Sequence, residues 1–351
     1  MSRLVLPLAA VLIALVALPG TGRGQDWLTR DLCSLTEMPV DPAGLVPNWP
    51  QIAQAAGKIE NGTGRLWRIT APEGQVSHLW GTAHSTDPLI LDLPFEVRTL
   101  IAAARMVALE RDPIFQTRAD WSAFNSGSQL FYGDGSRAFL DLLEPKLWAV
   151  VRERLSAFGY AESTIAAFAP AGVISVLLHD PCDDFAAGVL PIQDSRIQLL
   201  GLEAGARIIG LEEPFATLEA FNRPDMQATA VSIANVYGAY LAFARSHDLR
   251  RVIFSLYLTG QIGAHIALDR SLLSAYFNDP TGLYFQQTQR FLVDERNRMW
   301  METLPPVLDA GRAFVAVGAF HLPGAAGLVT LLRDAGYTVT RVPLPGEVDG
   351  E

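Results

Sequence analysis

Short apolar runs bounded by turn-forming residues mark the predicted strands of this chain. "RLWRIT" and "VSHLWG" flank the turn sequence "APEG", a pattern typical of a β-hairpin. "RMVALE" is a buried strand that ends at Glu110, and "ARIIGLE" is a second one that ends at Glu212. "AFVAVG" and "YTVTRV" close the chain as two further strands.

Longer stretches with apolar residues at helical spacing fall mainly between these strands. "LPFEVRTLIAAA" predicts a helix that begins near Pro94, and "AAGLVTLLRDAG" predicts one with Gly336 at its C-cap. Further helical or loop-broken stretches are "AFLDLLEPKLWAVVRERLSAFG", "AGVISVLL", "PIQDSRIQLLGLEAG" and "LVDERNRMWMETL". Strands come first, a long helical insertion follows, and the chain finishes in a βαβ-like unit. This order predicts an α/β fold, with a mixed, mostly parallel sheet flanked by helices and a helical cap insertion.

The same reading divides the chain into regions. Residues 25–61 read as an irregular lead-in with one short helix, and residues 344–351 as a tail. Residues 62–343 form the α/β domain, with the helical insertion at about 112–305. With 50% hydrophobic and 18% charged residues, the chain has enough apolar surface to bury a substantial core. Its net charge of −10 argues against nucleic acid and anionic lipid as partners.

The N-terminus has the features of an export signal. Arg3 precedes an apolar run from Leu4 to Leu18, and small residues precede a cleavage point before Gln25. The run is shorter than the about 20 apolar residues that a spanning helix needs, which favours a cleaved signal peptide. A retained membrane anchor is the alternative. We therefore predict a signal peptide at 1–24, a periplasmic or secreted protein, and no stable membrane span after cleavage.

An oxidising compartment changes the interpretation of the two cysteines, Cys33 and Cys182. They are either a disulfide pair or two independent buried thiols. Neither lies in a CxxC motif or at another metal-binding spacing.

The candidate chemistry lies at strand ends. "GTAH" and "GAFH" place His84 and His321 at the same spacing after a strand-terminal glycine, and Glu110 and Glu212 end two other strands. Ligands in open α/β sheets bind outside the carboxyl ends of the strands, so these four side chains converge if their strands are parallel neighbours. Such a set suits a divalent metal or an acid–base pair. We expect each glycine to tolerate a sharp backbone turn that aims its histidine into a cleft.

Each of these residues also has a structural explanation. A histidine after a strand is often a turn or surface residue, and a glutamate there is often solvated. Arg296 and Asn297 could reach a substrate from their helix, or belong to an ordinary charged helix face. The remaining histidines lack partners at ligand spacing and are interpreted as packing or surface residues: His78, His179, His247 and His265. The chain has no HExxH, GxSxG, Walker or GxGxxG motif, which excludes the common zincin, serine hydrolase and nucleotide-binding classes.

Taken in order, these motifs resemble the TraB/GumN family, which is related to the TIKI metalloproteases and more distantly to ChaN-like haem-binding proteins and erythromycin esterases. The resemblance rests on the first GxxH with Asp87-Pro88, "RMVALE", "IIGLEEP", the "ERN" helix and "FVAVGAFHLPGAAGLVTLLRDAGYTVTRV", and it covers about residues 62–343. It implies a metal-dependent hydrolytic site with His84 and His321 as the GxxH histidines and Glu110 as the glutamate. Further recurrent polar positions fall on Glu212, Arg296 and Asn297. Relatives carry a Gly-apolar-Asp segment at Ile192-Gln193-Asp194, and this departure leaves the role of Asp194 open.

The resulting prediction is an exported metal-dependent hydrolase acting on a peptide or small molecule. His84, His321 and Glu110 would hold Zn²⁺, Mn²⁺ or Co²⁺, a second carboxylate such as Glu212 would act as base, and Arg296 would bind an anionic group. The alternative is a protein of the same fold that binds a metal or haem without turnover.

Overall fold

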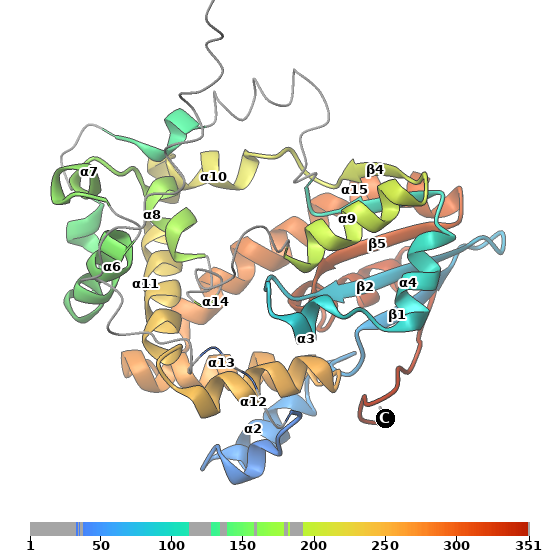
Figure 1. Cartoon of the computed structure of the whole chain (residues 1–351), viewed down its shortest axis with the longest axis horizontal. Helices are drawn as coiled ribbons and strands as arrows, with labels where there is room; N and C mark the ends of the chain where they lie inside the picture. Colours follow the sequence, from blue (N-terminus) through green and yellow to red (C-terminus); the bar gives the residue numbers. More distant parts are fainter. Residues whose placement is uncertain are drawn as a thin grey trace, which may run out of the picture.

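A computed structural model describes residues 33, 35, 38–111, 128–133, 139–157, 160–178, 182 and 192–349. One β-sheet lies on one side of the molecule, with helices on both of its faces (Figure 1). A second group of helices stands beside the carboxyl ends of the strands (Figure 1). The predicted signal peptide at 1–24 lies outside the described residues.

Within the described ranges the sheet has six strands, in the order β4-β3-β5-β2-β1-β6. Neighbours among β4, β3, β5 and β2 pair in parallel, while β1 runs antiparallel to both β2 and β6. The predicted mixed, mostly parallel α/β sheet is therefore confirmed. The strand bounds are β1 Leu66–Thr70, β2 Val76–Thr82, β3 Met106–Leu109, β4 Arg207–Gly210, β5 Ala313–Gly318 and β6 Thr338–Arg341.

The predicted hairpin is present as β1 and β2. The turn between them is closed by Gly74, whose φ of +95° favours a glycine. The final βαβ-like unit is also present, since β6 runs in the same direction as β5 and the helix α16 connects them.

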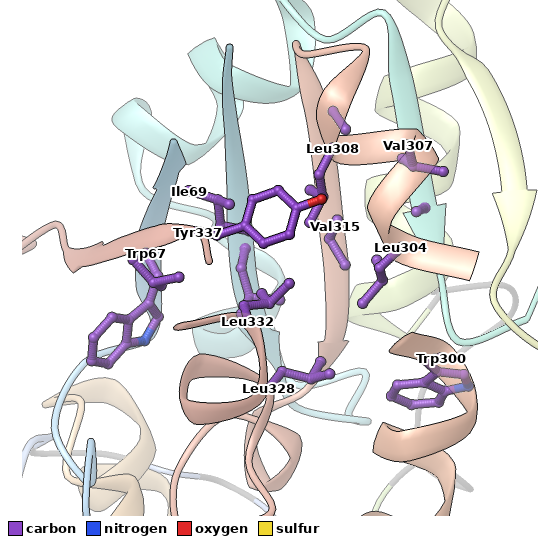
Figure 2. Packing of buried hydrophobic residues seen from close by; sticks show 14 of the residues in the cluster. Trp67, Ile69, Trp300, Leu304, Val307, Leu308, Val315, Leu328, Leu332 and Tyr337 are labelled. Atoms are coloured by element: carbon purple, nitrogen blue, oxygen red, sulfur yellow. The ribbon is translucent and has the colours of Figure 1, made fainter. Parts of the chain in front are cut away.

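Successive side chains along each strand point to opposite faces of the sheet, so a separate hydrophobic core forms on each face. On β5, Val315 and Val317 pack with residues of α15 (Glu295–Asp309) and α16 (Leu328–Asp334), as Figure 2 shows for part of this cluster. Phe314 and Ala316 of the same strand pack on the other face, against α4 (Phe95–Ala102) and α9 (Gln193–Glu203). The sheet is thus the middle layer of three, which fixes its strand ends in place.

The helical cap has its own core, in which α6, α8 and α11 pack together. The lead-in contributes the helix α2 (Trp49–Ala56), which packs against the cap helices α12 and α13. The cap helices are α6 Pro145–Ala157, α7 Glu162–Ala166, α8 Pro170–Leu177, α10 Ala216–Phe221, α11 Gln227–Phe243, α12 His247–Leu258, α13 Ile262–Phe277 and α14 Leu283–Gln289.

Shorter helical segments complete the structure. Asp87 caps the helix α3 (Pro88–Leu91) by accepting a hydrogen bond from Leu89 N. The others are η1 Pro42–Gly44, η2 Ser128–Phe131, η3 Leu140–Leu142, η5 Pro224–Met226, the π-helical turn η6 Arg290–Asp294 and η7 Ala319–His321. Among the helices of the described ranges, none has the length and apolar character needed to span a membrane.

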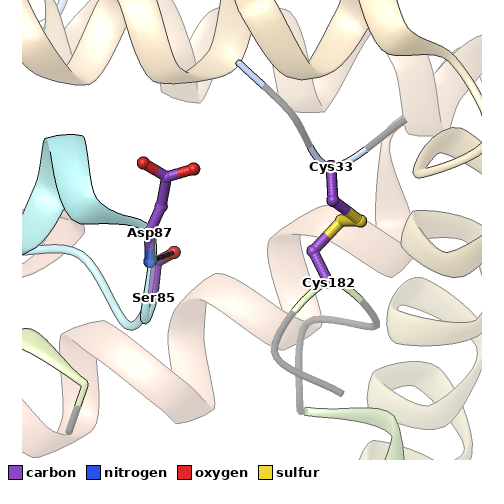
Figure 3. Close-up of a disulfide and its surroundings, with 4 residues drawn as sticks. All are labelled: Cys33, Ser85, Asp87 and Cys182. Carbon is purple, nitrogen blue, oxygen red and sulfur yellow. Dashed lines mark hydrogen bonds between the residues drawn. A yellow bond between two sulfur atoms is a disulfide. The ribbon is translucent and has the colours of Figure 1, made fainter. Parts of the chain in front are cut away.

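Cys33 and Cys182 form a disulfide, with Cα atoms 5.4 Å apart. Of the two interpretations of the cysteines, the structure supports the bonded one. The bridge joins the lead-in to the helical insertion, and Figure 3 shows it with Ser85 and Asp87 of the segment that follows β2.

Candidate functional site

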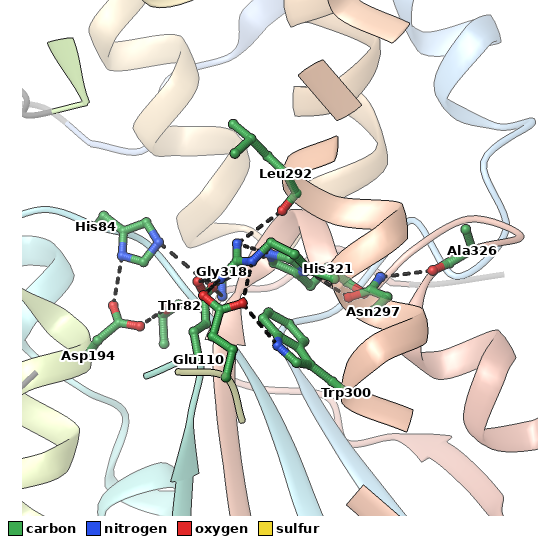
Figure 4. Close-up of polar contacts among 12 residues, drawn as sticks. Thr82, His84, Glu110, Asp194, Leu292, Asn297, Trp300, Gly318, His321 and Ala326 are labelled. Atoms are coloured by element: carbon green, nitrogen blue, oxygen red, sulfur yellow. Dashed lines mark hydrogen bonds and ion pairs between the residues drawn. The ribbon is translucent and has the colours of Figure 1, made fainter. Parts of the chain in front are cut away.

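The four polar residues predicted at strand ends follow four adjacent parallel strands. His84, His321, Glu110 and Glu212 come after β2, β5, β3 and β4, and these strands are neighbours in the sheet. The carboxyl ends of parallel strands meet at one edge. Figure 4 shows His84, Glu110 and His321 together at this edge, with Gly318 between them.

The two GxxH glycines act through their lack of a side chain rather than through a sharp turn. Neither has a positive φ, so the predicted turn-based reason for glycine is wrong. A Cβ on Gly81 would lie 3.0 Å from the Cα of Ala319, so this glycine lets the two GxxH segments pack closely. A Cβ on Gly318 would lie 3.2 Å from Glu110 Oε1 and 3.5 Å from His84 Nε2, so this glycine keeps open the space between those groups.

His321 is buried and held by Asn297 from the helix α15. Asn297 Nδ2 donates to the carbonyls of His321 and Ala326, at 3.1 and 2.8 Å, so its Oδ1 is the acceptor that faces His321 Nδ1 at 2.7 Å. The proton of the neutral ring therefore lies on Nδ1, and Nε2 keeps its lone pair. Burial lowers the pKa of His321 to about 3, against the opposing charge of Glu110, so the ring is neutral at pH 7.

Asn297 itself is 0% exposed. Its contacts are those of a residue that orients His321, and a contact with substrate stays a prediction.

His84 is held in a similar way by Asp194, the second residue of α9. Asp194 Oδ2 lies 3.1 Å from His84 Nδ1, and its other oxygen accepts from the Thr82 hydroxyl at 3.0 Å. The charge of Asp194 and its hydrogen bond raise the pKa of His84 to about 9. More than half of the His84 side chain is exposed, at 54%, so solvent screens part of the attraction. Asp194 thus has a defined place in the site despite the altered segment around it.

Arg296 lies between the two glutamates. Its Nη2 is 2.7 Å from Glu110 Oε2 and 2.7 Å from Glu212 Oε1, and its Nε donates to Glu212 Oε2 at 2.8 Å. Trp300 Nε1 donates to the same Glu212 oxygen at 3.3 Å. Both oxygens of Glu212 are thus occupied, and its side chain is 3% exposed. Burial alone would raise the pKa of Glu110, but Arg296, the two imidazoles and the Gly318 N–H lower it well below its usual range.

Both imidazoles direct Nε2 toward the same oxygen of Glu110. His84 Nε2 lies 3.9 Å from Glu110 Oε1, and His321 Nε2 lies 3.6 Å from it. The same oxygen accepts from Gly318 N at 2.7 Å. Arg296 Nη1 stands 3.4 Å from His321 Nε2 and donates to Leu292 O at 3.0 Å. Within the part of the chain that the structure describes, no group of three or more His, Cys, Asp or Glu side chains has an arrangement that could hold a metal ion.

A second layer behind His84 was not predicted from the sequence. Gln193 Oε1 accepts from Trp80 Nε1, Ala83 N and Tyr257 Oη, and Gln193 Nε2 donates to Ile90 O. In the sequence, the only indication that Gln193 belongs to the site is its position beside Asp194. No sequence pattern indicates Tyr257, which comes from the cap helix α12.

The other histidines lie apart from these contacts or outside the described residues. His78 lies on β2 between Arg68 and Phe314 of the neighbouring strands, and His247 is the first residue of α12. His179 is outside the described residues. His265 lies on α13, and its ring packs edge-on against Phe320, the residue before His321.

With this geometry in place, comparison with known sequences decides the family. The sequence model of the TraB/PrgY/gumN family matches residues 65–341, which is most of the chain. The chain belongs to this family. No curated protein and no solved structure matches the chain. The matched range contains the site residues described above, from Trp80 to Ala326.

Proposed function

We propose that this family member is an exported, metal-dependent hydrolase that acts on peptides. The observation that carries the proposal is the orientation of the two imidazoles: both use Nδ1 for a protein partner and both present Nε2 to Glu110 Oε1. Histidines that bind metals in proteins commonly donate their other ring N–H to a carboxylate or carbonyl group, which fixes the tautomer and the ring direction.

The donor set fits a borderline divalent ion such as Zn²⁺, Mn²⁺ or Co²⁺. His84, His321 and Glu110 offer two imidazole nitrogens and one carboxylate oxygen, leaving room for water as a further ligand. Two ligands of a tetrahedral Zn²⁺ lie about 3.4 Å apart. The separations of 3.6 and 3.9 Å between the imidazole Nε2 atoms and Glu110 Oε1 are close to this value. When bound, such an ion supplies a water of lowered pKa and polarises a carbonyl.

The remaining residues have roles that follow from their contacts. Arg296 holds the two glutamates through Nε and Nη2, and its Nη1 contacts Leu292 O and His321 Nε2. Binding of a carbonyl oxygen or a carboxylate of the substrate would replace one of the Nη1 contacts. Glu212 fixes the plane of the Arg296 guanidinium, because it accepts from both Nε and Nη2. We therefore assign Glu212 to positioning Arg296 rather than to the role of base, because both of its oxygens accept from Arg296 and its side chain is only 3% exposed.

Export is part of the proposal. The apolar N-terminal run and the Cys33–Cys182 disulfide both suit an oxidising compartment outside the cytoplasm, periplasmic or extracellular.

The proposal is tested by comparing peptide hydrolysis by wild type and by the Glu110→Gln variant. Purified protein supplied with Zn²⁺, Mn²⁺ or Co²⁺ is incubated with a mixture of fluorogenic peptides, and cleavage is followed by fluorescence and mass spectrometry. Wild type should cleave at least one peptide in a way that EDTA abolishes, and Glu110→Gln should lose this cleavage. Glu295→Gln is the matched control, because Glu295 is a half-exposed glutamate that pairs with Arg290 on the surface of the same helical segment as Arg296.

Full cleavage by Glu110→Gln, or cleavage that persists after EDTA, would contradict the proposal. Loss of cleavage with bound metal retained would assign Glu110 as the base, and loss of both would assign it as a ligand. Metal binding without cleavage of any peptide would favour the non-catalytic alternative.

A further inference from the structure

A second polar cluster lies on the cap, and the contacts described so far do not use it. Tyr240 of α11 donates to Asp269 Oδ2 of α13 at 3.0 Å. His265, one helical turn before Asp269, has its Nε2 3.7 Å from Asp269 Oδ1. Tyr237 packs edge-on against Tyr240, with ring centroids 5.5 Å apart.

This cap cluster borders the candidate site. The His265 ring lies at 81° to the Phe320 ring, with centroids 4.8 Å apart, and Phe320 immediately precedes His321. Burial, together with the negative charges of Asp269 and Glu110, raises the pKa of the Tyr237 hydroxyl to about 12, and the positive charge of Arg296 opposes this. The cap cluster therefore adjoins the candidate site through Phe320.

Within the described residues, Asp269 has no arginine or lysine partner, unlike the buried carboxylates of Glu110, Glu212 and Glu347. Glu110 and Glu212 pair with Arg296, and Glu347 pairs with Arg65 and Arg341. Among the described residues, the partner of Asp269 that can carry a positive charge is His265, and burial lowers the pKa of that histidine. The Asp269 side chain is only 7% exposed, and its burial raises the pKa of the carboxyl, which reflects the cost of the charge there.

The hydrogen bond from Tyr240 does not explain why residue 269 is an aspartate, because the amide oxygen of an asparagine would accept this bond equally well. Buried charges in proteins are usually paired, and an unpaired one suits a cation that arrives with a ligand. The aromatic faces of Tyr237 and Tyr240 add to this preference, since a cation is attracted to the face of a tyrosine ring. Both tyrosines and His265 are half-buried and so keep some surface for such a contact.

We propose that Asp269, Tyr240 and Tyr237 form a subsite that binds a primary ammonium group of the substrate. This inference deepens the proposed function and rests on it. It restricts the substrates to peptides that present either a free N-terminal amine or a lysine side chain near the bond that is cleaved.

Binding of small probes tests the subsite without any need for turnover. The probes are phenylalaninamide, which carries an N-terminal ammonium, N-acetyl-lysinamide, which carries a side-chain ammonium, and N-acetyl-phenylalaninamide, which carries none. Binding to the full chain is measured by calorimetry or by ligand-observed NMR. At least one ammonium probe should bind and the neutral one should not, and which ammonium probe binds identifies the source of the group.

Asp269→Asn should weaken the binding of the ammonium probe by about tenfold or more, because a charge-assisted hydrogen bond is replaced by a neutral one. Asp225→Asn is the matched control, since it removes an exposed carboxylate that pairs with Arg223 on the surface. If Asp269→Asn fails to fold, Tyr237→Leu replaces it, because that change removes an aromatic face and leaves the Tyr240–Asp269 hydrogen bond in place.

The inference is overturned if neither ammonium probe binds, if the neutral probe binds equally well, or if the subsite variants bind like wild type. His84→Ala separates this failure from failure of the proposed function. This variant removes a predicted metal ligand, and it should leave the binding of the ammonium probe to the cap cluster unchanged. If the probe instead binds to Asp269→Asn but not to His84→Ala, its amine is bound by the metal and not by the cap cluster.

Discussion

Replacing Arg296 by methionine should destabilise the protein strongly, because Arg296 balances two buried carboxylates. The guanidinium and its partners Glu110 and Glu212 are 13%, 11% and 3% exposed, so solvent cannot replace the lost contacts. Removing one partner of a buried ion pair costs about 3–5 kcal/mol, since the other charge is left uncompensated. At about 2 °C per kcal/mol for a chain of this size, the melting temperature should fall by roughly 6–10 °C.

The loss should depend on pH in a defined direction. In wild type the pKa of Glu110 is held well below its usual range, so its stabilising contribution is present above about pH 4.5 and is lost as pH falls through the lowered pKa. Without Arg296, burial dominates and raises that pKa. Protonation then relieves the unpaired charge, so the difference in stability between wild type and variant should be largest at pH 7–8 and should shrink toward pH 5.

Thermal unfolding followed by circular dichroism at several pH values measures both effects. Arg290→Met is the matched control, because Arg290 forms an exposed pair with Glu295, with side chains 76% and 44% exposed. Such surface pairs contribute about 0.2–1 kcal/mol. If Arg296→Met melts within 2–3 °C of Arg290→Met (about 1 kcal/mol), or if its deficit grows on acidification, the described charge balance is wrong.

Three further predictions follow from single contacts. Cys33→Ser should lower the stability by up to about 5 kcal/mol, because the bridge joins residues 149 apart in sequence; thermal unfolding should show the same loss for wild type in a reductant, and a variant as stable as oxidised wild type would contradict this. Gly318→Ala should weaken Zn²⁺ binding about tenfold or more while the fold is retained, since its Cβ would enter the space between Glu110 and His84. Calorimetry measures the affinity, and Gly44→Ala is the control because a Cβ there meets no atom within 4 Å. Unchanged affinity for Zn²⁺ in Gly318→Ala would refute the prediction. Asp194→Asn should lower the pKa of His84 from about 9 toward its ordinary value in metal-free protein; NMR titration measures this, and an unchanged value would show that Asp194 is not the main cause.

The fold could be predicted from the sequence to a large extent, because its strands have strong local signals. The "APEG" turn fixes the hairpin, and the apolar runs that end at Glu110, Glu212 and Gly318 each form a strand. Since parallel strands expose their carboxyl ends at one edge, the convergence of His84, Glu110 and His321 also follows from the pattern.

Other parts of the site depend on three-dimensional contacts that a sequence pattern does not encode. Gln193 and Tyr257 are 64 residues apart and meet only because the cap packs over the segment after β2. The occupied oxygens of Glu212 and the complete burial of Asn297 follow from how α15 packs against the sheet. Gly81 is a glycine because its segment packs closely against Ala319. This contact joins two segments far apart in sequence, so it can be seen only in the structure.

The most direct test of the account is the metal content of the protein and its dependence on the two histidines. Purified wild type, dialysed against Zn²⁺, Mn²⁺ or Co²⁺ and then against metal-free buffer, is analysed by inductively coupled plasma mass spectrometry beside His84→Ala, His321→Ala and the control His247→Ala. The account predicts about one equivalent of one of these metals in wild type and in His247→Ala, and far less than one in each of the other two variants. Wild type that retains no metal, or equal metal content in all four proteins, would contradict it.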